Sequence, residues 1–188
     1  MNLRRLLTCF IGLFAFVLCL AAQSPKFLPQ TTTEAVVNGK KVSITYGRPS
    51  INGPALAGHD LFSLAKVGFV WRFGRNEATF IESDGKLEAG GKELPPGKYT
   101  LWARRLSEDK WVISFHPKTE ENGKPLWGDV PGGAAAVQDG FIADIPLTAG
   151  KTSDSAEFLD VKLSEDKGNA TIAIHFGKVI QTGTFGVK

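Results

Sequence analysis

Cysteine, metal-ligand spacings and nucleophile motifs are scarce or missing in this chain, and each absence excludes a class of protein. The only two cysteines, Cys9 and Cys19, lie in the apolar N-terminal stretch, so the rest of the chain has no disulfide and no thiol nucleophile. The three histidines are far apart, and none shows the His-x-His or His-x-x-x-His spacing of a metal site. No Gly-x-Ser-x-Gly sequence is present. The sequence therefore identifies no catalytic residue, no metal ion and no cofactor.

A large excess of charge of one sign is also missing. The chain has 22 Lys and Arg against 19 Asp and Glu, a net charge of +3. Loss of an N-terminal segment that carries Arg4 and Arg5 would leave 20 basic residues against the same 19 acidic ones, a net charge of +1. A nearly neutral domain gives no electrostatic reason to bind nucleic acid or an anionic membrane. We therefore expect no nucleic-acid partner.

Only one long apolar run occurs, and it lies at the N-terminus. Residues 6–20 are apolar except for Thr8 and Gly12, Arg4 and Arg5 precede them, and two small residues at 21–22 follow. The run is shorter than the roughly 20 residues of a membrane-spanning helix. A basic start, a short apolar centre and a small-residue end are typical of a secretory signal peptide. Residues 1–22 are therefore predicted to be a signal peptide, which indicates a secreted or periplasmic protein with no membrane span in the mature chain.

Two other interpretations of the N-terminus differ in what becomes of this segment. An uncleaved N-terminal anchor is the alternative to a signal peptide. Lipid attachment at Cys19 is disfavoured, because Leu18 stands where a lipoprotein signal has a small residue. After the signal, we expect a flexible segment over residues 23–33 and a single domain over residues 34–188, which is long enough for a full-sized core.

Alternation of apolar and polar residues is the dominant pattern of that domain. Val42, Ile44 and Tyr46, for example, are separated by Ser43 and Thr45. A period of two over four to eight residues predicts a half-buried β-strand. The same alternation occurs at 99–104, 111–116, 159–163 and 171–176, and further strand candidates are 34–37, 77–82, 141–147 and 179–187.

Turn sequences separate these candidate strands. The dipeptide Asn38-Gly39 between two strand-like runs is typical of a tight hairpin. Only residues 60–66 have a helical pattern, for one or two turns. Many short strands without a long helix predict an all-β fold, a single antiparallel β-sandwich with at most one short helix, for which a jelly roll is one arrangement. A closed barrel is the alternative architecture.

Two short segments concentrate polar and aromatic residues. Residues 46–50 read Tyr-Gly-Arg-Pro-Ser, and residues 71–77 read Trp-Arg-Phe-Gly-Arg-Asn-Glu. Pro49 biases Arg48 towards extended backbone, so the Arg48 side chain is expected to point off a strand end. Guanidinium groups suit carboxylates and phosphates, and Glu77 offers a matching acceptor. Two interpretations remain open: a structural network that ties strand ends together, and the floor of a ligand pocket.

The ligand-pocket interpretation also uses aromatic side chains as stacking surfaces. Two long connections, at 49–68 and 117–140, are of the kind that often carries function. Trp127 lies within the second, where it either fastens the loop to the domain or lines a pocket. The candidate ligand is small and anionic or polyhydroxylated, and the candidate ligand-binding residues are Tyr46, Arg48, Trp71, Arg72, Asn76, Glu77 and Trp127.

The same segments resemble a known bacterial family. Residues 44–50, 70–79 and 91–101, together with Trp111 and the pair Trp127-Gly128, are similar to the motifs of the secreted family called domain of unknown function 2911. The resemblance extends over about residues 34–176. It implies a secreted β-rich domain whose biochemistry is unassigned.

Three classes of function follow from these observations. The first is an exported module that binds a small ligand or a glycan through a polar Arg/Glu/aromatic site. The alternative is a structural or protein-interaction domain of the cell envelope. A hydrolase that uses Glu77 is the second alternative, and it would need a second carboxylate at a defined separation. The sequence does not indicate an oligomeric state.

The N-terminal pattern gives the first testable prediction. Expression in a bacterial host with an export pathway should yield a mature protein that begins near Ala22 or Gln23, because cleavage follows the small residues that end the apolar run. N-terminal sequencing and intact mass measure this directly. A retained Met1, or a lipid on Cys19, would contradict it.

Overall fold

The computed structural model describes residues 29–54, 56–121, 124–125 and 137–188. It is an antiparallel, almost entirely β structure with one short helix, α1 (Leu61–Leu64), and this confirms the predicted all-β sandwich. The first sheet contains β1 (Thr31–Val37), β2 (Lys40–Tyr46), β3 (Val70–Trp71), β4 (Thr79–Ser83), β7 (Gly97–Ser107), β8 (Lys110–His116) and β11 (Ala143–Pro146). The second contains β5 (Leu87–Ala89), β6 (Lys92–Leu94), β12 (Thr148–Asp166) and β13 (Asn169–Val187), and β9 (Glu120–Glu121) pairs with β10 (Lys124–Pro125).

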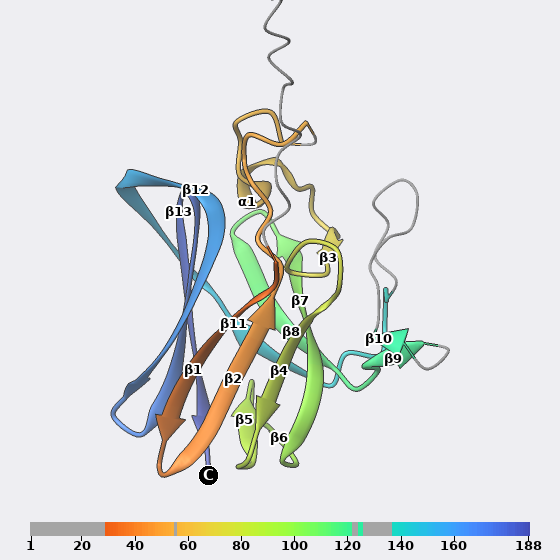
Figure 1. Cartoon of the computed structure of the whole chain (residues 1–188), viewed down its shortest axis with the longest axis vertical. Helices are drawn as coiled ribbons and strands as arrows, with labels where there is room; N and C mark the ends of the chain where they lie inside the picture. The colour runs from red at the N-terminus through yellow and green to blue at the C-terminus, as the bar shows by residue number, and fades with distance from the viewer. Residues whose placement is uncertain (1–28, 55, 122–123, 126–136) are drawn as a thin grey trace, which may run out of the picture.

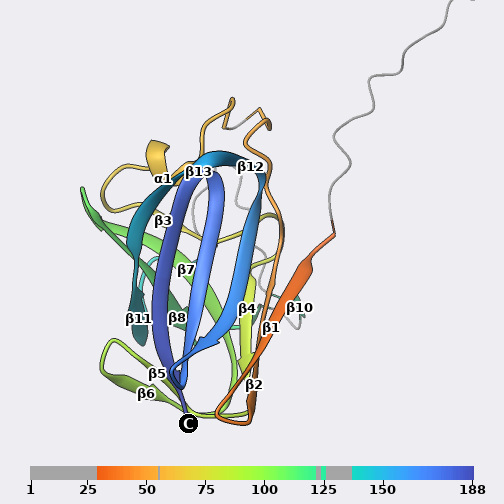
Figure 2. The same ribbon diagram turned by 90° about the vertical axis from the view of Figure 1, so that its left-hand side faces the viewer.

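The two large sheets form the two layers of the sandwich (Figure 1). The strand order is β1-β2-β4-β7-β8-β11 in the first sheet, with β3 beside β7, and β12-β13-β5-β6 in the second. Figure 2 shows β12 and β13 covering one side of the molecule, with α1 at one end and the C-terminus at the other. We call the face of the first sheet that points away from the second sheet the outer face.

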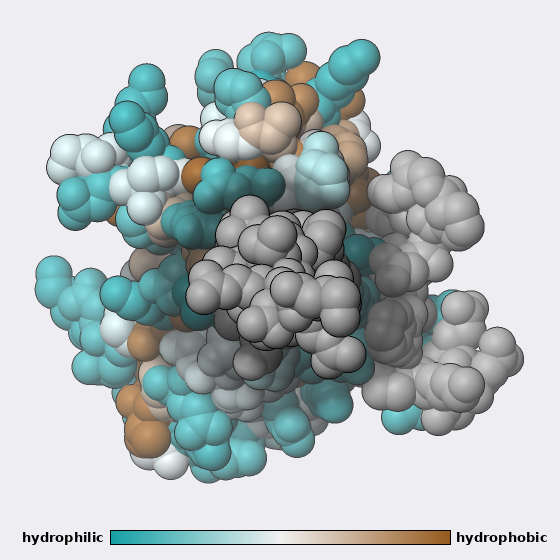
Figure 3. All heavy atoms as spheres, turned by 45° about the horizontal axis from the view of Figure 1, so that its top comes forward, coloured by the Kyte–Doolittle hydropathy of each residue, from teal (hydrophilic) through white to brown (hydrophobic). Residues whose placement is uncertain are grey.

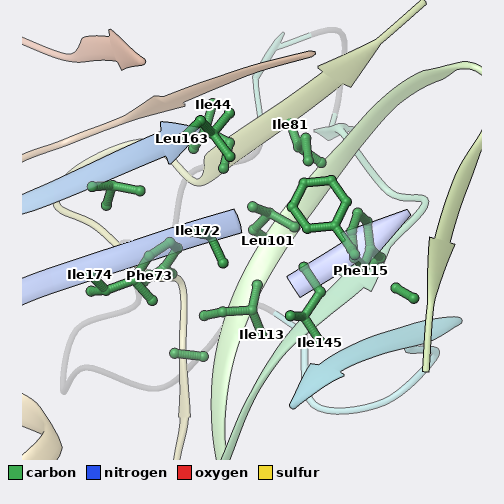
Figure 4. Close-up of a cluster of buried hydrophobic side chains, with 14 of the residues drawn as sticks. Ile44, Phe73, Ile81, Leu101, Ile113, Phe115, Ile145, Leu163, Ile172 and Ile174 are labelled. Carbon is green, nitrogen blue, oxygen red and sulfur yellow. The ribbon is translucent and has the colours of Figure 1, made fainter. Parts of the chain in front are cut away.

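The core lies between the layers and follows the predicted alternation. Val42, Ile44 and Tyr46 of β2 point inward, as do alternate residues of β7, β8 and β13. Side chains from both sheets meet in this interior, among them Ile44, Ile81, Leu101, Ile113, Phe115, Leu163, Ile172 and Ile174 (Figure 4). Burial of this apolar surface is the main favourable term for a fold with no disulfide.

The β1–β2 hairpin confirms the turn predicted at Asn38-Gly39. Both residues have positive φ, 51° and 73°, as a tight hairpin of this type requires. The Asn38 side-chain amide also donates to the carbonyls of Gly168 (2.9 Å) and Val187 (2.8 Å). One turn residue therefore fixes this end of the first sheet to two separate points of the second.

Strand β1 begins at Thr31, three residues before the predicted start of the domain at residue 34. The Thr32 and Thr45 hydroxyls are 2.9 Å apart, and the Thr33 hydroxyl accepts from the backbone N–H of Leu163 (3.1 Å). These contacts hold the first residues of β1 against β2 and β12, so the strand extends into the segment expected to be flexible.

The β12–β13 hairpin is much longer than the sequence pattern predicted. Each strand has 19 residues, whereas the expectation was a short strand at 159–163 and two separate strands at 171–176 and 179–187. The hairpin bends where the register shifts around Ala156 and where Gly177 has φ 62° (Figure 1). A positive-φ glycine and a bulge let the backbone turn sharply while the pairing continues on both sides.

A second hydrophobic cluster lies on the outer face of the first sheet. Trp102, in the polar phase of β7, is fully buried with Ala78, Phe80 and Val137, and Phe141 packs against them. The alternation therefore predicted the strand but not the burial of its second face. Ala78, just before β4, and Val137 and Phe141, after β8, cover this face of β7. No local pattern in β7 predicts these contacts.

Candidate functional site

The first motif, residues 46–50, joins the two sheets. The Tyr46 hydroxyl lies between them, where it accepts from the backbone N–H of Val161 (2.9 Å) and donates to the carbonyl of the same residue (3.3 Å). Burial raises the pKa of Tyr46, so its hydroxyl stays protonated and remains a donor. Tyr46 is 2% exposed. In this structure it fastens β2 to β12 and does not face a pocket.

Arg48 extends the same connection. Its Nε donates to the carbonyl of Leu159 (2.9 Å), and one of its terminal nitrogens lies 4.0 Å from the Asp160 carboxylate. The guanidinium also lies 5.7 Å from the centre of the Phe158 ring. The side chain leaves the end of β2, as the following proline led us to expect, and it is directed to the backbone of β12.

Gly47 brings the two motifs together. A Cβ built on Gly47 would lie 2.0 Å from the carbonyl oxygen of Arg75, a distance that no side chain tolerates. Gly74 faces Gly47 in turn, and a Cβ there would lie 2.8 Å from the Thr79 hydroxyl. The backbones of the 46–50 and 71–77 segments are therefore in direct contact, and the two glycines make that approach possible.

Trp71, the first residue of the second motif, belongs to an aromatic cluster. Its ring stacks on Phe176 of β13 at 6.4 Å and meets Phe62 and Phe73 edge-to-face at 6.0 and 5.8 Å. Its indole N–H donates to the carbonyl of Gly74 (3.2 Å). These contacts direct Trp71 towards the interior of the sandwich, where it holds the loop that follows.

The loop between β3 and β4 is shaped by two residues of positive φ. Phe73 has φ 51° and Asn76 has φ 65°, and the Thr79 hydroxyl donates to the carbonyl of Phe73. Arg72 and Asn76 are half-buried, and the Arg72 carbonyl accepts from the backbone N–H of Thr79 (3.4 Å). Non-glycine residues with positive φ are uncommon, and here they fix the position from which Glu77 departs.

Glu77 lines a pocket of about 170 Å³ on the outer face. Arg48 contacts β12 at the end of β2, so the structure brings the two motif backbones together but directs these two side chains to different places. The half-buried Glu77 carboxylate forms no hydrogen bond or ion pair with any residue that the structure describes. The pocket is lined by Gln30, Ser43, Thr45, Glu77, Phe80, Glu82 and Lys98.

Strand register explains why these residues share one pocket. Ser43 of β2 pairs with Glu82 of β4, and Glu82 pairs with Lys98 of β7, so the three form a row across the sheet. Thr45 and Phe80 form the next row. All five belong to the polar phase of their strands, which places them on the outer face.

The pocket contains polar groups whose hydrogen-bonding capacity is unused within the described part of the chain. Gln30 Nε2 is buried without a hydrogen-bond partner. Glu82, like Glu77, forms no hydrogen bond or ion pair with a described side chain. The Lys98 ammonium lies 4.4 Å from the centre of the Phe80 ring and makes no ion pair with either carboxylate. The lining therefore combines two carboxylate acceptors with amide, hydroxyl and ammonium donors, and the Phe80 ring is its apolar member.

Trp127, the seventh candidate residue, lies outside the described residues. Of the other six, Tyr46, Arg48 and Trp71 hold the layers and the loop together, and Arg72 and Asn76 belong to that loop. Glu77 is the member of the set that lines the outer-face pocket described above.

A polar cluster on the same face was not found by sequence reasoning. Ser114 donates to the Asp144 carboxylate (2.6 Å), and Arg104 lies 3.5 Å from the second oxygen of that carboxylate. The Arg104 guanidinium stacks on Phe141 at 4.3 Å, and both residues line a pocket of about 480 Å³. The strand alternation marked Ser114 and Arg104 as outward-facing, but only the pairing of β8 with β11 brings Asp144 to them.

The histidines do not assemble a metal site. Among the residues that the structure describes, no group of three or more His, Cys, Asp or Glu side chains is arranged to hold a metal ion. His116 is half-buried, and its ring meets Phe141 edge-to-face at 5.8 Å. Burial, together with the charge of Lys118, lowers the pKa of His116 below its usual 6.5.

Comparison with known proteins gives one match. The family model described as "Protein of unknown function (DUF2911)" matches residues 28–182, which include both motifs and the outer-face pocket. Neither a curated protein nor a solved structure matches the chain. Within the described residues, no helix has the length and apolar character needed to cross a membrane.

The link between Tyr46 and Val161 gives a stability prediction. Tyr46→Phe should lower the free energy of unfolding by about 1–3 kcal/mol, because it leaves a buried N–H and a buried carbonyl of Val161 without their hydroxyl partner. Urea denaturation of the two proteins measures the difference.

Tyr99→Phe is the matched control for that experiment. The Tyr99 hydroxyl donates to the carbonyl of Pro95 (2.8 Å), an exposed residue that water can reach after the change. We expect a loss of less than about 1 kcal/mol. Equal losses in the two variants would show that Tyr46 has no special role in joining the sheets.

His116 gives a pH-dependence prediction. Because its pKa is lowered in the folded state, the unfolded chain binds the proton more readily, and stability falls as pH falls from about 6.5 through the folded-state pKa. The variant His116→Asn should lose this part of the pH dependence, whereas His59→Asn, a change at an exposed histidine, should retain it. Thermal unfolding followed between about pH 7.5 and pH 5 tests this; a parallel profile for His116→Asn and wild type would contradict it.

Proposed function

The chain belongs to the DUF2911 family of proteins of unknown function, and we propose that it is an exported module that binds a small polyhydroxylated ligand in the Glu77 pocket. The observation that carries the proposal is the half-buried Glu77 carboxylate, which no described residue satisfies. The oxygens of this carboxylate are not fully buried, so solvent reaches them, and a ligand hydroxyl would take the place of water as their hydrogen-bond donor.

The charges that line the pocket favour one of the two ligand classes proposed from the sequence, the polyhydroxylated class over the anionic class. Two carboxylates, Glu77 and Glu82, face one ammonium, Lys98, so an anionic ligand would meet net repulsion. Carboxylates accept hydrogen bonds and hydroxyl groups donate them, which favours the polyhydroxylated class. Ser43 and Thr45 add hydroxyls that can donate or accept.

The volume of the pocket limits the size of the ligand that it can hold. Its volume of about 170 Å³ lies below the roughly 300–1,000 Å³ of pockets for drug-sized molecules. A single sugar ring or a small polyol therefore fits this surface better than a long oligosaccharide. Export, as the N-terminal pattern predicts, would expose the pocket to such molecules in the periplasm or the medium.

Glu77→Gln tests the proposal. Neutral sugars and sugar alcohols are screened for a rise in the melting temperature of the wild-type protein, and the positive compounds are titrated by calorimetry. The variant should bind at least about tenfold more weakly, since a hydrogen bond to a charged group contributes about 1.5–3 kcal/mol. Its melting temperature without ligand should stay close to that of the wild type, because no described residue depends on the Glu77 carboxylate.

Asp166→Asn is the matched control, since it makes the same carboxylate-to-amide change at an exposed hairpin turn. It should leave both stability and binding unchanged. The proposal fails if no neutral sugar or polyol raises the melting temperature, or if Glu77→Gln binds as tightly as the wild type.

A glycoside hydrolase is the second candidate, because Glu82 places a second carboxylate in the pocket of Glu77. Hydrolysis uses a pair of carboxyl groups on either side of the scissile bond. Release of reducing sugar from a bound oligosaccharide, lost in both Glu77→Gln and Glu82→Gln, would establish this activity. Binding without turnover would leave the chain as a binding module.

A further inference from the structure

A second pocket enters the sandwich from the end that carries α1. It has a volume of about 360 Å³ and shares no lining residue with the Glu77 pocket. Phe62 of α1 and Trp111 of β8 form one wall, and their rings meet edge-to-face at 4.9 Å. Gly150 of β12 and Gln181 of β13 lie on the other wall.

Gln181 is an unusual residue for this position. It is 3% exposed and lies on the inner face of β13, in the same phase as the core residues Phe185 and Val187. Its side-chain oxygen Oε1 is buried and has no hydrogen-bond partner, and the described residues offer its amide no other hydrogen bond. A buried carbonyl without a donor is costly, and an apolar residue would avoid that cost. The amide therefore presents one free acceptor and one free donor group to the pocket.

The charged groups around the pocket leave it close to neutral. Arg105 donates to the carbonyl of Ala65 and to Glu108, so its guanidinium is already occupied. Lys151 and Asp109, of opposite charge, also line the pocket and are exposed. A charged ligand would meet the exposed Lys151 and Asp109 together, with no net attraction to either sign of charge, whereas a neutral ligand would lose little hydration on entry.

We infer that this pocket binds a small neutral molecule that carries a carboxamide or lactam group. A small rotation of the Gln181 side chain turns the buried Oε1 towards the ligand, so that the N–H of the ligand group donates to Oε1 and its carbonyl accepts from Gln181 Nε2. The pairing is the same if the Gln181 amide is turned by 180°, because both partners present one donor and one acceptor side by side. The apolar body of the ligand lies against the Phe62 and Trp111 rings, and the volume falls within the range of pockets for small organic molecules.

The surface around α1 is consistent with a small ligand rather than a protein partner. Seen from this end, hydrophobic residues form small patches among hydrophilic ones (Figure 3). Leu64 and Val67 are about half exposed, but charged residues such as Lys66 lie beside them. Scattered apolar residues of this kind are normal on a protein surface.

Benzamide is the probe for the test, with benzoate as its charged counterpart. Titration into the full mature protein, followed by calorimetry and by the indole N–H signal of Trp111 in NMR spectra, should show binding of benzamide and at least tenfold weaker binding of benzoate. Gln181→Leu, of similar size but without the amide, should lose at least tenfold in benzamide affinity. The same variant should melt about 2–4 °C higher without ligand, because it removes the unpaired buried amide.

Two control variants show whether binding depends on the Gln181 amide and on this pocket. Gln138→Leu makes the same chemical change at an exposed residue outside the pocket and should leave benzamide binding unchanged. Glu77→Gln should also leave it unchanged, so the two pockets are tested independently. The inference is overturned if benzamide does not perturb Trp111, if Gln181→Leu binds it as well as the wild type does, or if Gln181→Leu melts at a lower temperature.

Discussion

The contact of Tyr46 with the backbone of Val161 is the constraint on which the rest of the structure depends. It joins the first sheet to β12 at the point where β2 ends, and Arg48 repeats the connection two residues later at Leu159. Gly47, between them, is pressed against the backbone at Arg75. Three consecutive residues therefore fix the separation of the layers and the position of the loop that leads to Glu77.

Within the two motifs, some side chains stabilise the fold, whereas the Glu77 carboxylate has no partner among the described residues. The aromatic side chains of Tyr46 and Trp71 pack in the interior, where Trp71 stacks on Phe176, and the partly exposed Arg48 binds the backbone of β12. Glu77 emerges on the opposite side of the sheet, beside strand residues that hold no partner for it. A sandwich that presents such a carboxylate without rearrangement would lower the entropic cost of binding the proposed ligand.

The burial of Trp102 gives the outer face a hydrophobic cluster of its own. With Phe80 and Phe141 packed beside this ring, the sheet has a second apolar layer, and the pockets of Glu77 and Arg104 open on either side of it. The α1 end differs, because residues of both sheets line its pocket and two of them, Phe62 and Trp111, belong to the core. Two ligand sites of different chemistry are therefore compatible with one small domain.

The sequence by itself determined strands such as β2, β7 and β8, the Asn38-Gly39 turn and which face of these strands points inward, because these depend on local backbone preference and on period-two burial. It also drew attention to the two motifs, although it did not show which of their residues face a pocket. Only the tertiary structure decided that Arg48 and Glu77 diverge, that Asp144 meets Arg104, and that Gln181 lies unpaired beside Trp111. Those outcomes depend on contacts between residues far apart in the chain, which no local pattern encodes. The continuous β13 is the intermediate case, since the glycine at 177 allows a bend, but its close approach to Asp60 of a distant segment exists only in the folded structure.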